Sequence, residues 1–124
     1  VWLTSSTAIF SNLDIVSQHS KGVALVSTNP NAVRSGSKSA VVAIGIDRRN
    51  NAHLAAIYAL RILRDGVDPG TLEVGVVTPP DIALNFQVAR QLGLKIPFAF
   101  LEAASFVYDY NGALVRSFGQ DVTP

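Results

Sequence analysis

Two uninterrupted runs of apolar residues constrain the fold of this chain more than any other feature of its sequence. Residues 23–26 read Val-Ala-Leu-Val and residues 40–44 read Ala-Val-Val-Ala-Ile, and both runs are rich in β-branched side chains. A strand that is apolar on both faces must be covered on both sides, which is typical of parallel sheets packed between helices. The sequence therefore predicts an α/β fold with a parallel sheet in three layers, αβα.

The first helix is predicted to lie between an N-terminal strand at residues 1–3 and the apolar run 23–26. Ser6 or Thr7 can cap its free N–H groups, and Lys21 followed by Gly22 marks its predicted end. Its apolar residues recur at helical spacing, at Ile9, Phe10, Leu13 and Val16.

A longer helix is predicted to follow the second apolar run. Asn50 or Asn51 can cap it and Gly66 ends it. Its apolar stripe is wide, which predicts burial on more than one side. A short helix is expected over residues 86–92, where Gly93 stops it.

Two further short strands are predicted between these helices, at residues 73–77 and 82–84. Pro79 and Pro80 separate them, and neither proline could lie inside a central strand. Strands that alternate with helices in this way imply right-handed crossover connections.

The last part of the chain, residues 98–124, carries the pattern of an aromatic β-hairpin. Residues 106–110 and 113–116 flank Asn111-Gly112, a dipeptide that favours a type I′ turn because both central residues need positive φ. Strand alternation predicts one shared face for three aromatic side chains, Phe106, Tyr108 and Tyr110.

Composition excludes several classes of function. The net charge of +1, with scattered Lys and Arg, predicts no nucleic-acid partner, and the absence of Cys excludes a thiol nucleophile. His19 and His53 lie on different predicted helices without a second ligand at metal-binding spacing. The Gly-Ser-Lys-Ser stretch within residues 35–39 lacks the upstream glycine of a phosphate-binding loop. We therefore predict a non-catalytic protein with no catalytic residue, metal site or cofactor.

Five short motifs occur along the chain in the order that is typical of one known family. They are Leu3-Thr4-Ser5, Gly45-Ile46-Asp47, Arg61-Ile62-Leu63-Arg64-Asp65-Gly66, Val77-Thr78-Pro79 and Leu92-Gly93-Leu94-Lys95-Ile96-Pro97. In this order they resemble the ABC-transporter substrate-binding proteins of the aromatic amino-acid type, which have the type I periplasmic-binding fold. The resemblance covers about residues 1–97 and suggests the C-terminal part of such a protein.

The resemblance implies two α/β lobes that hold a solute in the cleft between them. Residues 1–44 and 72–97 would then belong to one lobe, and residues 45–71 would cross to the other. It also implies an ABC permease as partner and a periplasmic or extracytoplasmic location, with a lipid anchor as one form of attachment. Without the second lobe, exposed strand edges would favour a homodimer.

The predicted binding residues all follow strands directly, at the edge of the sheet where ligands of α/β proteins bind. By resemblance, Thr4 would donate to a ligand carboxylate and Asp47 would pair with an amino group, although Asp47 could equally cap the helix that follows it. Arg48 replaces a family aromatic residue, which favours a more anionic or more polar solute. The predicted rim comprises Thr4, Ser5, Ser6, Asn29, Asp47 and Arg48.

The predicted function is capture of a small polar solute for an ABC importer, without chemistry on the solute. One alternative is a ligand-free structural or sensory interaction module of the same fold. A second alternative, an enzyme, would need Asp47 or Asp81 to work beside a base that the sequence does not supply.

Overall fold

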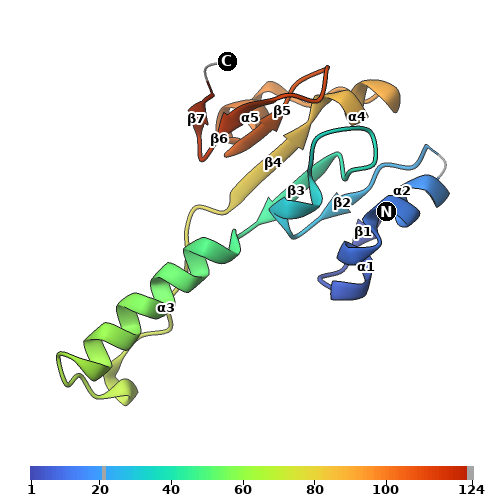
Figure 1. The fold of residues 1–124 in the computed structure, drawn as a ribbon. Helices are drawn as coiled ribbons and strands as arrows, with labels where there is room; N and C mark the ends of the chain where they lie inside the picture. Colours follow the sequence, from blue (N-terminus) through green and yellow to red (C-terminus); the bar gives the residue numbers. More distant parts are fainter. Residues whose placement is uncertain (21, 123–124) are drawn as a thin grey trace.

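The computed structural model describes residues 1–20 and 22–122, and within them it contains one seven-stranded sheet (Figure 1). The strands lie side by side in the order in which they occur along the chain. They are β1 (Trp2–Leu3), β2 (Val26–Ser27), β3 (Val42–Gly45), β4 (Asp81–Asn85), β5 (Phe106–Tyr108), β6 (Leu114–Ser117) and β7 (Gln120–Asp121).

The sheet is mixed rather than wholly parallel. Strands β1, β2 and β3 run parallel to one another, and so do β4 and β5, as the sequence predicts. Strand β4 is antiparallel to β3, with Ala43 opposite Ala83, and β6 and β7 continue the sheet in antiparallel fashion. The antiparallel step arises because the segment between β3 and β4 leaves the sheet and returns to the same place. The α/β class is confirmed.

Helices cover both faces of the sheet, which confirms the layered arrangement. Leu13 of the N-terminal helical region packs with Leu3 and Ala43 on one face. On the other face, Val88 packs against Val41, and Leu84 packs against Val107. The helices are α1 (Thr7–Ser11), α2 (Leu13–His19), α3 (Arg48–Leu63), α4 (Phe86–Gln91) and α5 (Phe98–Ala103), with 3-10 turns η1 (Pro30–Ala32) and η2 (Pro69–Thr71).

The first predicted helix is divided into α1 and α2 at Asn12. This residue has φ −118° and ψ 26°, outside the helical range, and its side-chain amide donates to the carbonyl of Ala8 at 2.9 Å. A side chain that competes for backbone groups in this way interrupts a helix. Helix α2 ends at His19, and the predicted end at Lys21 lies outside the described residues. No helix in the described part of the chain is long and apolar enough to cross a membrane.

Residues 48–80 form an arm that projects from the body of the molecule (Figure 1). Helix α3, of 16 residues and about 24 Å long, runs outward, and residues 64–80 return beside it. The Tyr58 hydroxyl donates to the carbonyl of Glu73 at 2.9 Å, and Gly75 lies close against Leu54 and Tyr58. No residue of α3 is buried. The predicted burial of this helix on more than one side is therefore wrong, because no other described element covers the arm.

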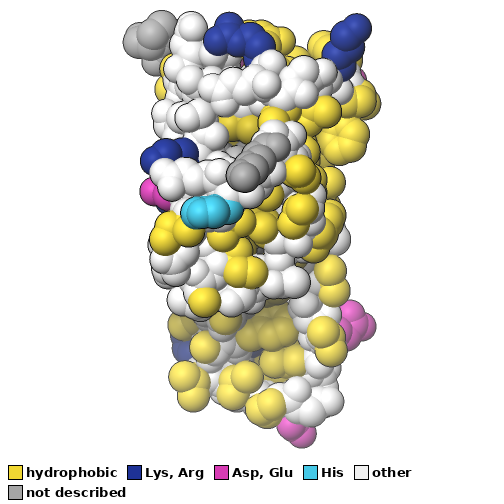
Figure 2. All heavy atoms as spheres, turned by 90° about the vertical axis from the view of Figure 1, so that its right-hand side faces the viewer, with side chains coloured by type: hydrophobic (Ala, Val, Ile, Leu, Met, Phe, Trp, Pro, Cys, Tyr) yellow, Lys and Arg dark blue, Asp and Glu magenta, His cyan; other side chains and the backbone are white. Residues whose placement is uncertain are grey.

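The returning segment is extended but forms no strand, so the predicted strand at residues 73–77 is also wrong. Gly75 faces α3, while Val74 and Val76 point away from it and are 91% and 72% exposed. The side view of the molecule shows hydrophobic side chains spread over much of one face, with few charged groups among them (Figure 2). Because Gly75 lies against α3, residues 72–80 belong with the arm rather than with the sheet. The division of the chain into two lobes stays a prediction.

The C-terminal hairpin is confirmed as β5 and β6, but its turn differs from the predicted one. Only Gly112, with φ 84°, has positive φ there, and the Asp109 carboxylate accepts from the N–H groups of Asn111 and Ala113. Because the Asp109 side chain holds the turn through these backbone N–H groups, the turn forms without a second residue of positive φ. The turn in which two successive residues have positive φ lies instead between β6 and β7, at Phe118 and Gly119.

The predicted single aromatic face of the hairpin is wrong for one residue. Phe106 and Tyr108 pack against the buried cluster that contains Val33 and Ala83. Tyr110 lies beyond the last residue of β5 and turns to Phe86 of α4, with ring centres 5.4 Å apart. Strand alternation no longer applies to Tyr110 because the chain has already entered the turn.

Candidate functional site

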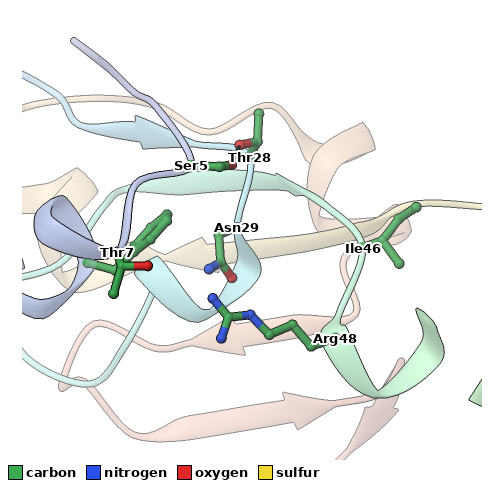
Figure 3. A pocket seen from close by; sticks show the side chains of 7 residues that line it. Ser5, Thr7, Thr28, Asn29, Ile46 and Arg48 are labelled. Carbon is green, nitrogen blue, oxygen red and sulfur yellow. Dashed lines mark hydrogen bonds between the residues drawn. The ribbon is translucent and has the colours of Figure 1, made fainter. Parts of the chain in front are cut away.

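A pocket of about 180 Å³ lies at the carboxyl ends of β1, β2 and β3. Its side chains come from the segments that follow these three strands, and Figure 3 shows them from close by. This position agrees with the rule that ligands of α/β sheets bind beyond the carboxyl ends of parallel strands. The pocket is lined by Ser5, Thr7, Phe10, Thr28, Asn29, Ile46 and Arg48.

Two hydroxyl groups join the first two segments of this pocket. The Ser5 and Thr28 oxygens are 2.8 Å apart and share a hydrogen bond, although 23 residues separate them. The third segment also lies against Thr28, because a Cβ atom added to Gly45 would lie 1.7 Å from the Thr28 carbonyl oxygen. Glycine at the end of β3 therefore allows the loop after β2 to reach the pocket.

Asn29 is oriented by its own loop. Its side-chain oxygen accepts from the backbone N–H of Asn31 at 3.0 Å and caps η1, and its backbone N–H donates to the Ser27 hydroxyl at 3.0 Å. Because the oxygen is fixed by this cap, the amide NH₂ group is the free end. It forms no hydrogen bond within residues 1–20 and 22–122, so it is available as a donor in the pocket.

Asp47 is a structural residue in this fold. Its carboxylate is almost fully buried, with 4% of the side chain exposed. The same carboxylate caps α3 by accepting from the Arg49 N–H at 2.8 Å and contacts the Arg49 guanidinium at 3.3 Å. Asp47 does not line the pocket, so of its two sequence-based interpretations, the helix cap is the one that the structure shows.

The two adjacent arginines at the start of α3 point to different places. Arg48 lines the pocket, and its guanidinium group reaches toward Asn29 (Figure 3). Arg49 stacks on the ring of Phe118, with its guanidinium carbon 4.7 Å from the ring centre. Only one of the pair therefore contributes to the pocket.

The structure brings together half of the predicted rim. Ser5, Asn29 and Arg48 meet in the pocket. Thr4, Ser6 and Asp47 lie beside it without lining it. Four lining residues are absent from the predicted set: Thr7, Phe10, Thr28 and Ile46. Thr7 and Thr28 could have been found, because each belongs to a polar cluster directly after a strand, whereas Phe10 and Ile46 carry no such signal.

Sequence reasoning also misses the polar side chain of Asn85, at the junction of β4 and α4. It is fully buried, and its oxygen accepts from the Val88 N–H and caps α4. Its NH₂ group donates to the carbonyls of Arg34 and Gly36, at 2.7 and 3.1 Å. Asn85 thus holds the Ser-Gly-rich loop in place, which gives that loop a structural explanation.

Hydroxyl, amide, guanidinium and apolar groups make up the lining of the pocket. These groups can bind a solute through hydrogen bonds and one positive charge. Among the described residues, no three His, Asp or Glu side chains gather as metal ligands would.

Comparison with known proteins adds one structural relative. No protein-family model and no curated protein matches the chain. The fold is similar to a crystal structure of a conserved domain protein from Vibrio cholerae O1 biovar eltor, with a TM-score of 0.62 and 24% sequence identity. The match covers 86% of this chain but only 35% of the Vibrio chain. At this level of identity the likeness shows a shared fold.

Proposed function

We propose that this chain binds a small polar solute as part of an ABC-type import system and performs no chemistry on it. The observation that carries the proposal is the convergence of three polar segments at the carboxyl ends of parallel strands. The motif order that resembles the substrate-binding family supports the same function. An ABC permease and an extracytoplasmic location belong to the proposal through that resemblance.

The size and position of the pocket support a cleft with two walls. Its volume of about 180 Å³ is below the roughly 300–1,000 Å³ of usual ligand pockets. Ile46 and Arg48 line the pocket at the point where the arm begins, so a lobe that packed on the base of the arm would lie next to the pocket. We therefore propose that the described pocket is one wall of the binding site.

The proposal is tested by thermal-shift screening against amino acids, short peptides and small carboxylates, followed by titration calorimetry. A ligand at 100 times its Kd should stabilise the protein by about 2.7 kcal/mol. Thr28→Val, which removes a pocket hydroxyl, should weaken binding. Ser35→Ala is the matched control, because the Ser35 hydroxyl bonds Gly112 away from the pocket. If no solute raises the melting temperature, the proposed function is wrong.

The exposed apolar surface of the arm favours the second candidate, an interaction module. Val74, Val76 and Leu63 are all largely exposed, and surfaces of this kind often mark protein contacts. In this case the screen would find no solute, while association through the arm would remain.

A further inference from the structure

The two arginines that follow Asp47 have different electrostatic environments. Arg49 is held by the Asp47 carboxylate and the Phe118 ring, at 3.3 and 4.7 Å. In contrast, the Arg48 side chain forms no hydrogen bond or ion pair within the described ranges 1–20 and 22–122, and it lines the pocket. The positive charge of Arg48 therefore has no protein partner there.

Among the residues that the structure describes, none that lines the pocket carries a negative charge to balance Arg48. Among its lining residues, Arg48 alone carries a formal charge. The two acidic side chains at the base of the arm are engaged elsewhere. Asp47 binds Arg49, and Asp81 accepts from the backbone N–H of Asp47 and the amide of Asn50. A solute that carries a negative charge would therefore supply the missing partner.

The remaining lining groups extend the description of the solute. The Asn29 NH₂ group is a donor with its oxygen already used. The shared hydrogen bond between Ser5 and Thr28 uses one of their two hydroxyl protons, so the other hydroxyl can still donate. Phe10 and Ile46 give the pocket two apolar surfaces. Donors beside a guanidinium group suit a carboxylate, and the apolar surfaces suit a short carbon chain.

We infer that the solute is a small organic carboxylate whose charged group pairs with Arg48. This inference rests on the proposed function and names the class of solute. A guanidinium group binds a carboxylate through two parallel hydrogen bonds, which adds geometry to the charge attraction. Asp47 has no direct role in binding the solute.

The test uses pairs of probes of similar size, one charged and one neutral, namely butyrate with butyramide and succinate with succinamide. Calorimetric titration of the 124-residue chain should give at least tenfold tighter binding for each acid than for its amide. Arg48→Ala should abolish that preference, and Arg48→Lys should keep part of it. Arg49→Ala is the matched control, because it removes the neighbouring charge outside the pocket, and it should change affinity less than threefold.

The possible outcomes distinguish an error in the class of solute from an error in the proposed function. Binding of amides as tightly as acids, or tight acid binding by Arg48→Ala, would overturn the role of Arg48 and leave solute binding intact. If none of the four probes binds but a neutral solute from the wider screen does, the carboxylate class is wrong and the function stands. If the wider screen also finds nothing, both proposals fail. Binding of the acids should weaken as salt is added, because the charge of Arg48 lies at the surface.

Discussion

The backbone N–H of Asp47 donates a hydrogen bond to the Asp81 carboxylate at 3.0 Å, although the two residues are 34 positions apart. Asp47 directly precedes α3, and Asp81 is the first residue of β4, so the bond closes the base of the arm. The side chain of Asn50 adds a second bond to the same carboxylate at 3.3 Å. The chain therefore leaves and re-enters the sheet at one place, beside the pocket.

Replacing Asp81 with alanine should destabilise the protein. The change leaves the Asp47 N–H without its charged acceptor at the base of the arm, which should cost about 1.5–3 kcal/mol. Urea unfolding would measure the loss. Asp65→Ala is the control, because Asp65 forms an exposed pair with Arg64, and such pairs contribute about 0–1 kcal/mol. Equal losses for the two variants would show that the bond at the base of the arm is not important for stability.

Gly45→Ala should disturb both stability and the pocket. The added Cβ would overlap the Thr28 carbonyl oxygen, and overpacking of this kind costs about 1–3 kcal/mol. Because Thr28 lines the pocket, ligand affinity should fall as well. At Gly70 the added Cβ would come no closer than 3.4 Å to another atom, so Gly70→Ala is the control for calorimetry and unfolding. Wild-type behaviour of Gly45→Ala would contradict the close approach.

Asn85→Ala should be among the most destabilising substitutions in the sheet body. It removes the α4 cap and two bonds to loop carbonyls, with an expected total of about 2–4 kcal/mol. Denaturant unfolding gives the value, and limited proteolysis should show earlier cleavage near Gly36. Asn111→Ala, at an exposed turn position, should change stability by less than about 0.5 kcal/mol. A similarly small effect for Asn85→Ala would contradict its structural role.

The stability of the fold should decrease in alkaline solution because of Tyr108. Burial raises the pKa of the Tyr108 hydroxyl above its ordinary value, so the folded state favours the neutral form. This contribution is fully present below the unfolded pKa of about 10 and is lost as the pH rises through the higher folded pKa. Above the unfolded pKa of about 10, the free energy of unfolding should fall less steeply with pH in Tyr108→Phe than in the wild type. Urea unfolding at a series of pH values measures this difference. An unchanged slope in the variant would exclude Tyr108 as the cause.

The isolated chain should self-associate through its arm. Val74→Asp combined with Val76→Asp places charges on the exposed extended segment, and sedimentation velocity should show a shift toward monomer. Ile15→Asp is the control, because Ile15 is an exposed apolar residue of α2 in the sheet body. A wild-type chain that stays monomeric at all concentrations would refute self-association through the arm.

Local patterns were sufficient to predict most elements near the site. The apolar runs at residues 23–26 and 40–44 correspond to β2 and β3, with shifts of a few residues. The apolar stripe indicated the long helix, but its predicted cap at Asn50 or Asn51 is wrong, because Asp47 caps it and the helix begins at Arg48. The polar clusters after the strands indicated Ser5, Asn29 and Arg48. These features depend on periodicity, capping and strand order, which are properties of neighbouring residues.

By itself the sequence thus determined the α/β class, the order of the elements and the edge of the sheet where polar groups gather. Only the tertiary structure decided that β4 runs antiparallel to β3, because the arm returns to its starting point. It also decided that Asp47 binds Arg49 while Arg48 faces the pocket, and that Gly45 and Thr28 touch. The first kind of feature is a contact between segments that are far apart in the sequence. The second is a difference between two adjacent residues of the same type. No local pattern predicts either. Their outcome depends on how the packed sheet places each backbone segment.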